Sequence, residues 1–387
     1  MNGPLQGIKV IEMAHLMAGP VAGLMLADMG ADVIKVERPS GDDTRHSAPY
    51  INGEAASYMM MNRSKRGIVM DLKDPAEVAR LRTMIAQSDV LLENFRPGTL
   101  AKLGLGYDSL KDENPGLIYG AISGFGRTGP YADRAGFDLI AQGMSGIMSV
   151  TGEGPGCPPC KVGPPVSDIT AGTLLAMGVC AALEHRNRTG EGQIVETSLM
   201  EAAITHTYWQ SGIAFATGED PAPMGSAHPL NAPYQALRTA DGYINIGAAN
   251  QGNWERLVSL IGRPDLGEDP RFATNDARMA NRLALEDVLN AIFSQQPSAH
   301  WLALLEAGGF PAGPVLSIRE MHADPQTIAR DMVPEVTHPV AGVVQTLGLP
   351  VKFSRTPGGV TGPAPTLGQH RDEILADFGL NEGEPHG

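Results

Sequence analysis

A single carboxylate, Asp168, stands where a proline- and glycine-rich stretch meets a long apolar segment that reaches about Arg186. This pattern predicts a helix that starts close to the aspartate. The first backbone N–H groups of a helix have no partner within it, and they attract a carboxylate. Asp168 can therefore cap the helix, which stabilises it by about 1 kcal/mol, or it can act as a nucleophile. On these residues alone the cap is the preferred interpretation, and the nucleophile remains open.

Other side chains with useful chemistry follow the ends of predicted strands. His15 follows the first strand, Arg38 the second, and Asn94, Phe95 and Arg96 a later one. In an open α/β sheet the carboxyl ends of the strands line the ligand crevice. A guanidinium binds phosphate, and a neighbouring amide and aromatic ring can hold a base. The alternatives are a structural histidine, a solvated arginine and an ordinary loop.

Two further motifs are weaker. Residues 124–129 match G-x-G-x-x-G, but a dinucleotide site also needs a helix at the last glycine, and Pro130 and Tyr131 predict a loop there. Cys157 and Cys160 have C-x-x-C spacing, but no second pair of ligands completes a zinc site. We therefore expect no nicotinamide cofactor and no metal, and we interpret the two thiols as incidental loop residues.

The elements that must position these residues alternate between strands and helices. Nearly continuous apolar runs are typical of buried parallel strands. The alternation predicts an α/β fold with an open, mostly parallel sheet. The expected strands are 8–12, 33–37, 90–93, 117–122 and 193–197, and the expected helices are 20–29, 75–88, 137–148, 168–186 and 198–214.

The pattern changes after about residue 217, where glycine, proline, methionine and histidine become frequent. We expect a large domain that begins with residues 1–219, a smaller α+β domain at 220–325, and a segment at 326–387 that returns to the large domain. The expected elements here are strands at 243–247 and 350–354 and helices at 254–261, 284–293, 299–307 and 370–378.

Composition limits the classes of function. The chain has 387 residues, 42% hydrophobic and 19% charged, with a formal net charge of −14. This charge disfavours a general nucleic-acid or anionic-membrane surface, but it leaves room for a local basic site. The first residues lack the regions of a signal peptide, no apolar run looks long enough to span a bilayer, and three cysteines form no disulfide framework. We expect a cytoplasmic protein with no nucleic-acid or membrane partner.

A set of short segments, taken in order, resembles the class III (CaiB/BaiF-like) CoA-transferase family over nearly the whole chain. The matching segments are 16–20, 27–37, 41–45, 93–98, 123–126, 162–168 and 188–193. The resemblance implies a Rossmann-like large domain, a smaller domain, and an interlocked homodimer. It also implies coenzyme A, bound as an acyl-CoA co-substrate, and a carboxylic acid as the second substrate.

The resemblance implies a role for each matching position. Asp168 falls at the nucleophilic aspartate, which forms a covalent aspartyl intermediate. Gly247, Gln251 and Gly252 fall in the glycine loop that covers this aspartate in formyl-CoA transferases. The positions expected to line the CoA site, with Arg96 added from the loop of Asn94 and Phe95, are Ala18, Arg38, Met70, Lys73, Asn94, Phe95, Arg96, Lys102, Ala135 and Asp138.

Two positions bear on the reaction. The family includes α-methylacyl-CoA racemases, which use a histidine at the position of Phe137, and a phenyl ring cannot transfer a proton. The chain therefore resembles formyl-CoA transferases more than racemases. Met17 stands where the formyl-CoA transferases have glutamine, so formyl or oxalyl specificity does not follow. A usual Asp pKa of about 3.9 keeps Asp168 ionised at pH 7, so no pKa tuning is expected.

The expected activity is the transfer of CoA to a small mono- or dicarboxylic acid. His228, Arg238 and Arg256 of the smaller domain are candidates to meet a second carboxylate. Two alternatives remain: an acyl-CoA isomerase or racemase, which would exchange an α-proton, and an acyl-CoA-binding protein that forms no covalent intermediate.

Overall fold

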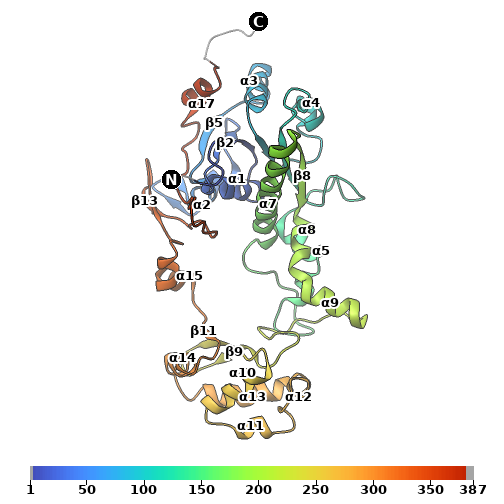
Figure 1. Ribbon diagram of the computed structural model, residues 1–387, viewed down its shortest axis with the longest axis vertical. Coiled ribbons are helices and arrows are strands. Elements are labelled where there is room, and N and C mark those ends of the chain that lie inside the picture. The colour runs from blue at the N-terminus through green and yellow to red at the C-terminus, as the bar shows by residue number, and fades with distance from the viewer. Residues whose placement is uncertain (1–2, 381–387) are drawn as a thin grey trace. The chain divides into compact units, whose positions relative to one another are not determined.

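The structure is a computed structural model that describes residues 3–380. The described chain divides into two compact units (Figure 1). The larger unit comprises residues 3–147, 161–206 and 324–380, and the smaller unit comprises 148–160 and 207–323. Residues 148–160, which the sequence placed in the large domain, group with the smaller unit because the Gly225 N–H donates to the Gly152 carbonyl oxygen over 2.8 Å.

A parallel sheet of six strands, all within the described residues, organises the larger unit. The strands are β1 (Lys9–Met13), β2 (Asp32–Glu37), β5 (Arg66–Val69), β6 (Val90–Glu93), β7 (Ile118–Ser123) and β8 (Gln193–Ser198). Their spatial order is β5-β2-β1-β6-β7-β8, so the chain reverses its direction across the sheet between β1 and β6. Such a switch point opens a crevice at the carboxyl ends of the two strands. The α/β class and the parallel sheet expected from the sequence are confirmed.

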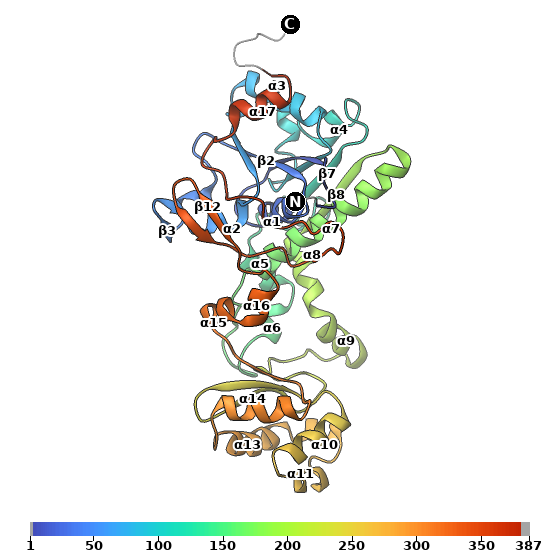
Figure 2. The same cartoon turned by 60° about the vertical axis from the view of Figure 1, so that its left-hand side comes forward.

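Helices cover both faces of this sheet. On one face lie α1 (Ala18–Asp28) and α7 (Val166–Thr189), and on the other lie α3 (Pro75–Ala86) and α17 (Arg371–Asp377). Alternate strand residues supply the two cores: Val10 faces α1 and α7, whereas Ile11 faces the opposite layer. Figure 2 shows α3 and α17 side by side at the top of the larger unit. The guanidinium of Arg371 joins them through Glu77, at 2.8 Å.

The long helix α7 touches α1 at a glycine. A Cβ atom at Gly172 would lie 2.5 Å from the Ala18 carbonyl oxygen, so only glycine allows this approach. By length and composition α7 is apolar enough to cross a bilayer, although Asp168, Thr170 and Thr173 interrupt its apolar residues. Its inner face, with Ala171 and Leu175, packs into the core of the larger unit, which is the pattern of a core helix.

Several expected elements have different bounds in the structure. The helix expected at 137–148 is two helices, α5 (Asp138–Met144) and α6 (Ile147–Val150), because Gly146 has a left-handed φ of 89°. The helix expected at 198–214 divides into α8 (Leu199–Ile204), a 3₁₀ turn and α9 (Tyr208–Thr217). The strand expected at 350–354 does not form. Pro350 cannot donate a ladder hydrogen bond, and the late strands β12 (Glu335–His338) and β13 (Gly342–Gln345) pair with each other instead.

The remaining elements complete the two units. In the larger unit they are β3 (Tyr50–Ile51), β4 (Glu54–Ala55), α2 (Ala56–Asn62), α4 (Tyr107–Leu110), α16 (Pro325–Ala329) and 3₁₀ turns at Asp43–His46 and Ala101–Leu103. The smaller unit holds an antiparallel sheet of β9 (Tyr234–Arg238), β10 (Tyr243–Gly247) and β11 (Ala312–Pro314). Its other helices are α10 (Gln251–Leu260), α11 (Asp265–Glu268), α12 (Asn275–Ala280), α13 (Arg282–Phe293), α14 (Ser298–Ala307) and α15 (Ile318–Ala323).

Candidate active site

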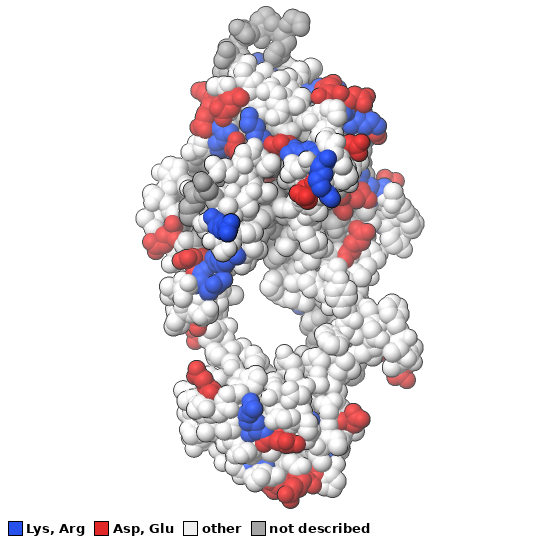
Figure 3. All heavy atoms as spheres, in the orientation of Figure 1, with Lys and Arg blue, Asp and Glu red and all other residues white. Residues whose placement is uncertain are grey.

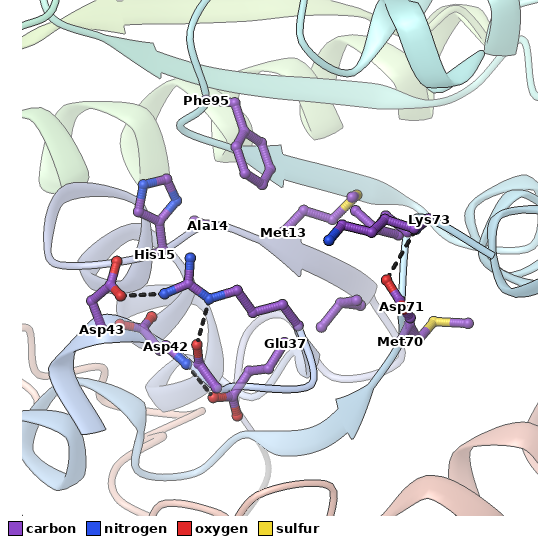
Figure 4. A pocket seen from close by; sticks show the side chains of 14 residues that line it. Met13, Ala14, His15, Glu37, Asp42, Asp43, Met70, Asp71, Lys73 and Phe95 are labelled. Atoms are coloured by element: carbon purple, nitrogen blue, oxygen red, sulfur yellow. Dashed lines mark hydrogen bonds and ion pairs between the residues drawn. The ribbon is translucent and has the colours of Figure 1, made fainter. Parts of the chain in front are cut away.

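Two cavities lie where the switch point of the sheet predicts a crevice. The first cavity has a volume of about 300 Å³ and is lined by Arg38, Met70, Lys73, His15 and Phe95, together with Asp42, Asp43 and Asp71. In Figure 4 His15 and Phe95 lie on one side of it and Lys73 on another. Arg38 pairs with Asp43, and its Nε donates to the Gly41 carbonyl oxygen at 3.0 Å. An anionic ligand with a planar ring can meet cationic and aromatic side chains here, but at Arg38 it competes with the carboxylate of Asp43.

The second cavity, of about 410 Å³, holds the acidic residue singled out in the sequence. It is lined by Met17, Ala18, Asn94, Arg96, Ala135, Phe137 and Asp168. His15 and Phe95 line both cavities, and their ring centroids are 5.3 Å apart. The two spaces therefore adjoin at this ring pair, and one extended ligand can reach from Arg38 to Asp168.

The turn between the cavities is held by three side chains: Asn94 directly after β6, Lys35 within β2, and Asp42 in the loop after β2. Asn94 uses both ends of its amide: Oδ1 accepts from the His15 N–H at 2.9 Å, and Nδ2 donates to the His15 carbonyl oxygen at 2.8 Å. Lys35 donates to the Ala14 carbonyl oxygen at 2.9 Å, and Asp42 accepts from the Leu16 N–H at 3.3 Å. The amide of Asn94 thus orders the wall of the site.

Asp168 is the third residue of α7 and not its cap. The helix starts at Val166, and its N-cap is Pro165, which makes no side-chain capping bond. Burial, and after it the negative charge of Asp138, raises the pKa of Asp168 to about 6. The expectation of an untuned carboxylate was wrong, because half-burial removes much of the water that would stabilise the charge. The group is still roughly nine-tenths ionised at pH 7.

Asp138 holds the entry to this helix. Its Oδ1 accepts from the Ser167 N–H at 2.9 Å, and its Oδ2 accepts from Gln142 Nε2 at 2.7 Å. Gln142 in turn accepts from the Val162 N–H at 2.9 Å. The first residue of α5 and the buried Gln142 therefore fix the segment that leads to Asp168.

Comparison with known proteins agrees with this geometry. The family model for CoA-transferase family III matches residues 5–371. The chain belongs to CoA-transferase family III. Succinate–glutarate CoA-transferase of Agrobacterium fabrum is 43% identical over 383 residues, covering 97% of this chain and 96% of the relative. Acetyl-CoA:oxalate CoA-transferase of Acetobacter aceti is 40% identical over 355 residues, covering 91% and 90%.

A crystal structure of a CAIB/BAIF family protein from Brucella suis has the same fold as this CoA-transferase. It is 42% identical, with a TM-score of 0.88, and the match covers 98% of this chain and 100% of that one. The family expected from the sequence is confirmed, and so is its activity as a CoA-transferase. The closer likeness to formyl-CoA transferases stays a prediction.

Several positions expected at the site lie outside both cavities of the CoA-transferase. Lys102 is exposed in the turn Ala101–Leu103, and Asp138 is occupied by its own hydrogen bonds. Gly247 ends β10, and Gln251 and Gly252 open α10 in the smaller unit. Gln251 donates to the Ala273 carbonyl oxygen at 3.0 Å. Their contacts with substrate stay predictions.

The candidates for a second carboxylate also lie in the smaller unit. His228 stacks on Tyr234, and Arg256 donates to the Gly309 carbonyl oxygen at 3.1 Å. Arg238 lies on β9. The two cavities of the CoA-transferase are lined by residues of the larger unit alone. Among residues 3–380 no cluster of three or more His, Cys, Asp or Glu side chains could hold a metal ion.

A buried ion network beneath the first cavity was missed in the sequence. Lys35 contacts Glu12 Oε1 at 3.1 Å and Asp42 Oδ2 at 3.0 Å, and Lys65 contacts Glu12 Oε2 at 2.7 Å. Burial alone would lower the pKa of Lys35, but Glu12 and Asp42 together raise it. The available signal was the lysine itself, which interrupts an otherwise apolar strand.

Glu93, also missed, links two loops of the site. Its Oε2 accepts from the Phe95 N–H at 2.8 Å, and its Oε1 lies 3.3 Å from Arg127 in the glycine-rich loop after β7. Burial raises the pKa of Glu93 to about 7, although the Phe95 N–H and Arg127 both favour the charged form. The charge of this buried carboxylate therefore bears directly on the loop that carries Phe95.

Proposed function

We propose that this protein moves CoA from an acyl-CoA thioester to a small dicarboxylic acid, with Asp168 as the covalent nucleophile. The observation that carries the proposal is the position of Asp168 in a cavity that adjoins the cavity of Arg38 and Lys73 at the His15–Phe95 pair. An extended thioester with its nucleotide at Arg38 would bring its acyl end toward Asp168.

The covalent steps balance without a metal or a redox partner. An Asp168 oxygen attacks the thioester carbonyl, the C–S bond breaks, and a mixed anhydride and the CoA thiolate result. The thiolate attacks the aspartyl carbonyl and releases the donor acid, leaving aspartyl-CoA. The acceptor carboxylate attacks that thioester, the thiolate leaves again, and it then attacks the acceptor's acyl carbon. New acyl-CoA departs and the Asp168 carboxylate is restored, with no net proton transfer.

Two observations favour transfer over α-proton chemistry. Phe137, whose side chain is 64% exposed and lines the second cavity, offers no group that accepts or donates a proton. The relatives named succinate–glutarate and acetyl-CoA:oxalate CoA-transferase both take acids with two carboxylates. Dicarboxylic acids are therefore the substrate class that we propose for this chain.

Covalent capture tests the nucleophile directly. Wild-type enzyme incubated with succinyl-CoA should gain the mass of CoA less one water, and borohydride or hydroxylamine should trap the adduct at Asp168. Asp168→Ala should show neither adduct nor transfer, while Asp112→Ala, at an exposed aspartate of the larger unit, should behave as wild type. Transfer by Asp168→Ala at the wild-type rate, or an adduct on another residue, would refute the assignment.

We also propose the interlocked homodimer. Support comes from α9, where Tyr208, Trp209 and Phe215 are 79%, 61% and 90% exposed, since large apolar side chains on one short helix usually meet a partner. Light scattering after size exclusion should give twice the chain mass of 40.8 kDa. A monomer at micromolar concentration would contradict the proposal.

A further inference from the structure

The second cavity carries more positive than negative charge, in a chain whose net charge is −14. Its charged lining consists of Arg96, Arg134 and Asp168. Both arginine side chains are exposed, and neither forms an ion pair with a carboxylate of residues 3–380. Arginine side chains that face a cavity without a protein partner are suited to bind an anion from solution.

Arg134 is held in place by an aromatic ring. Its guanidinium carbon lies 4.0 Å from the ring centroid of Tyr131, and its backbone N–H donates to the Tyr131 carbonyl oxygen at 2.9 Å. Tyr131 packs edge-on against Phe125, with centroids 5.9 Å apart. Stacking on an aromatic face holds a guanidinium plane and leaves its N–H donors at the edge available.

The segment that carries Arg134 is fixed at the carboxyl end of β7. Gly124 and Gly136 approach so closely that a Cβ on Gly136 would lie 2.5 Å from the Gly124 Cα. Ala135, Gly136 and Phe137 all line the second cavity with Asp168. Arg134 is thus presented to the same space as the proposed nucleophile by backbone contacts that leave little freedom.

We propose that Arg134 binds the unreacting carboxylate of the dicarboxylic substrate, and so selects diacids over monoacids. The proposal rests on the function proposed above. One carboxylate of such an acid forms the thioester or anhydride, and the other stays charged in the cavity beside Arg134, whose side chain is exposed in the free protein. A guanidinium can bind that carboxylate with two parallel N–H···O hydrogen bonds, one to each oxygen. A monoacid of equal length has nothing to pair with it.

A phosphate of CoA presents the same anionic chemistry, and the experiment separates the two sources. Succinyl-CoA and butyryl-CoA carry the same nucleotide and the same number of acyl carbons, and they differ in the terminal carboxylate. Formation of the aspartyl-CoA adduct is measured with each in single turnover, for wild type, Arg134→Met and Arg134→Lys. Arg188→Met serves as the control, since that side chain is 69% exposed at the end of α7.

The expected result is selective. Arg134→Met should slow adduct formation from succinyl-CoA by roughly 10-fold, the low end for a charged hydrogen-bond pair, because the Arg134 side chain is exposed in the free protein. The rate with butyryl-CoA and the inhibition constant of free CoA should stay within about twofold. Arg134→Lys should recover part of the succinyl-CoA rate, because it keeps the charge and loses the fork. Arg188→Met should match wild type.

Other outcomes would overturn the proposal. Equal losses with both thioesters, together with weaker inhibition by CoA, would place Arg134 on a phosphate. Unchanged selectivity would remove Arg134 from recognition. If wild type captures no butyryl-CoA, the same comparison is made by binding to Asp168→Asn enzyme, where Arg134→Met should reduce the affinity for succinyl-CoA to that for butyryl-CoA. A wild type that captures neither thioester would refute the nucleophile, not Arg134.

Discussion

The carboxylate of Asp138 accepts a hydrogen bond of 2.9 Å from the backbone N–H of Ser167, the residue directly before Asp168, while its charge raises the pKa of Asp168. One side chain therefore positions the proposed nucleophile and opposes its ionisation. Because burial is the larger cause of the raised pKa, the arrangement keeps a reactive carboxylate in a partly dry space. The carboxylate is the form required for attack on a thioester, so its pKa sets the acid limit of the reaction.

Replacing Asp168 by asparagine should lower the activity and stabilise the folded protein. We expect CoA transfer to fall by roughly 10³-fold or more, because the amide is no nucleophile. The pKa of Asp168 is higher in the folded protein than in the unfolded chain. The free energy of unfolding therefore decreases as pH rises from about 4 to about 6. Asp168→Asn should therefore be about 1–2 kcal/mol more stable than wild type at pH 8, after allowance for partial exposure. Denaturant titrations at pH 4 and pH 8 check this, and a gain of equal size at both pH values would contradict it.

The acid limb of the pH profile should report Asp168. For wild type, kcat/KM for the acyl-CoA should fall tenfold per pH unit below about 6. Asp138→Asn should move this limb down by less than about one pH unit, because the larger cause, burial, remains. The maximal rate should also fall, since an amide cannot accept from both Ser167 and Gln142. An upward move of the limb would exclude the charge of Asp138 as a cause.

Glu93 gives a second pH dependence, at higher pH. Burial raises the pKa of Glu93 to about 7 in the folded protein, so folding favours the protonated side chain. The free energy of unfolding therefore decreases as pH rises from about 4.5 to about 7. Glu93→Gln should therefore be about 1–2 kcal/mol more stable than wild type at pH 8 and equal to it near pH 4. Its amide oxygen can still accept from Phe95, so KM for acyl-CoA should change little. Thermal unfolding across pH measures this, and a variant less stable at pH 8 would contradict it.

Glycine at position 172 should be required for the packing of α1 on α7. An alanine Cβ there would lie 2.5 Å from the Ala18 carbonyl oxygen and 2.8 Å from Val21 Cβ, and backbone cannot yield easily. We expect Gly172→Ala to destabilise the fold by about 1–3 kcal/mol. It should also lower the rate of CoA transfer, because a displaced Ala18 would change the lining of the second cavity. Gly267→Ala is the control: an added Cβ at this glycine of α11 would meet only Val258 Cγ2 among the described atoms, at 3.5 Å, and alanine should add up to about 1 kcal/mol of stability. Equal effects of both substitutions would argue against the contact.

Charge patterning on the surface is consistent with small-molecule substrates. Figure 3 shows acidic and basic side chains interspersed on the displayed face of the larger unit, with no continuous basic stripe there. Cationic groups lie instead in the cavities, where Arg38 and Lys73 line the first and Arg96 and Arg134 the second. Only the second cavity has more cationic than anionic side chains in its lining, because four carboxylates also line the first. A locally positive cavity in an acidic protein concentrates an anionic substrate at the site itself.

The sequence predicted the elements well where its signal was local. Strands with continuous apolar runs, such as 90–93, have the same bounds in the structure, because burial on both faces leaves no room for another pattern. The expected strand at 350–354 failed because an apolar run needs a partner strand, and pairing is decided by distant residues. The split at Gly146 was missed since a positive φ leaves no mark in apolar periodicity.

By itself the sequence determined the α/β class, the family and the carboxylate at the start of the long helix. These follow from periodicity and from ordered short motifs, which are properties of neighbouring residues. Only the tertiary structure decided that burial raises the pKa of Asp168, that Asn94 holds the turn at His15, and that Arg134 lines the cavity of Asp168. Each of these depends on residues far apart in the chain, and packing sets both their separation and the amount of water left around a charge.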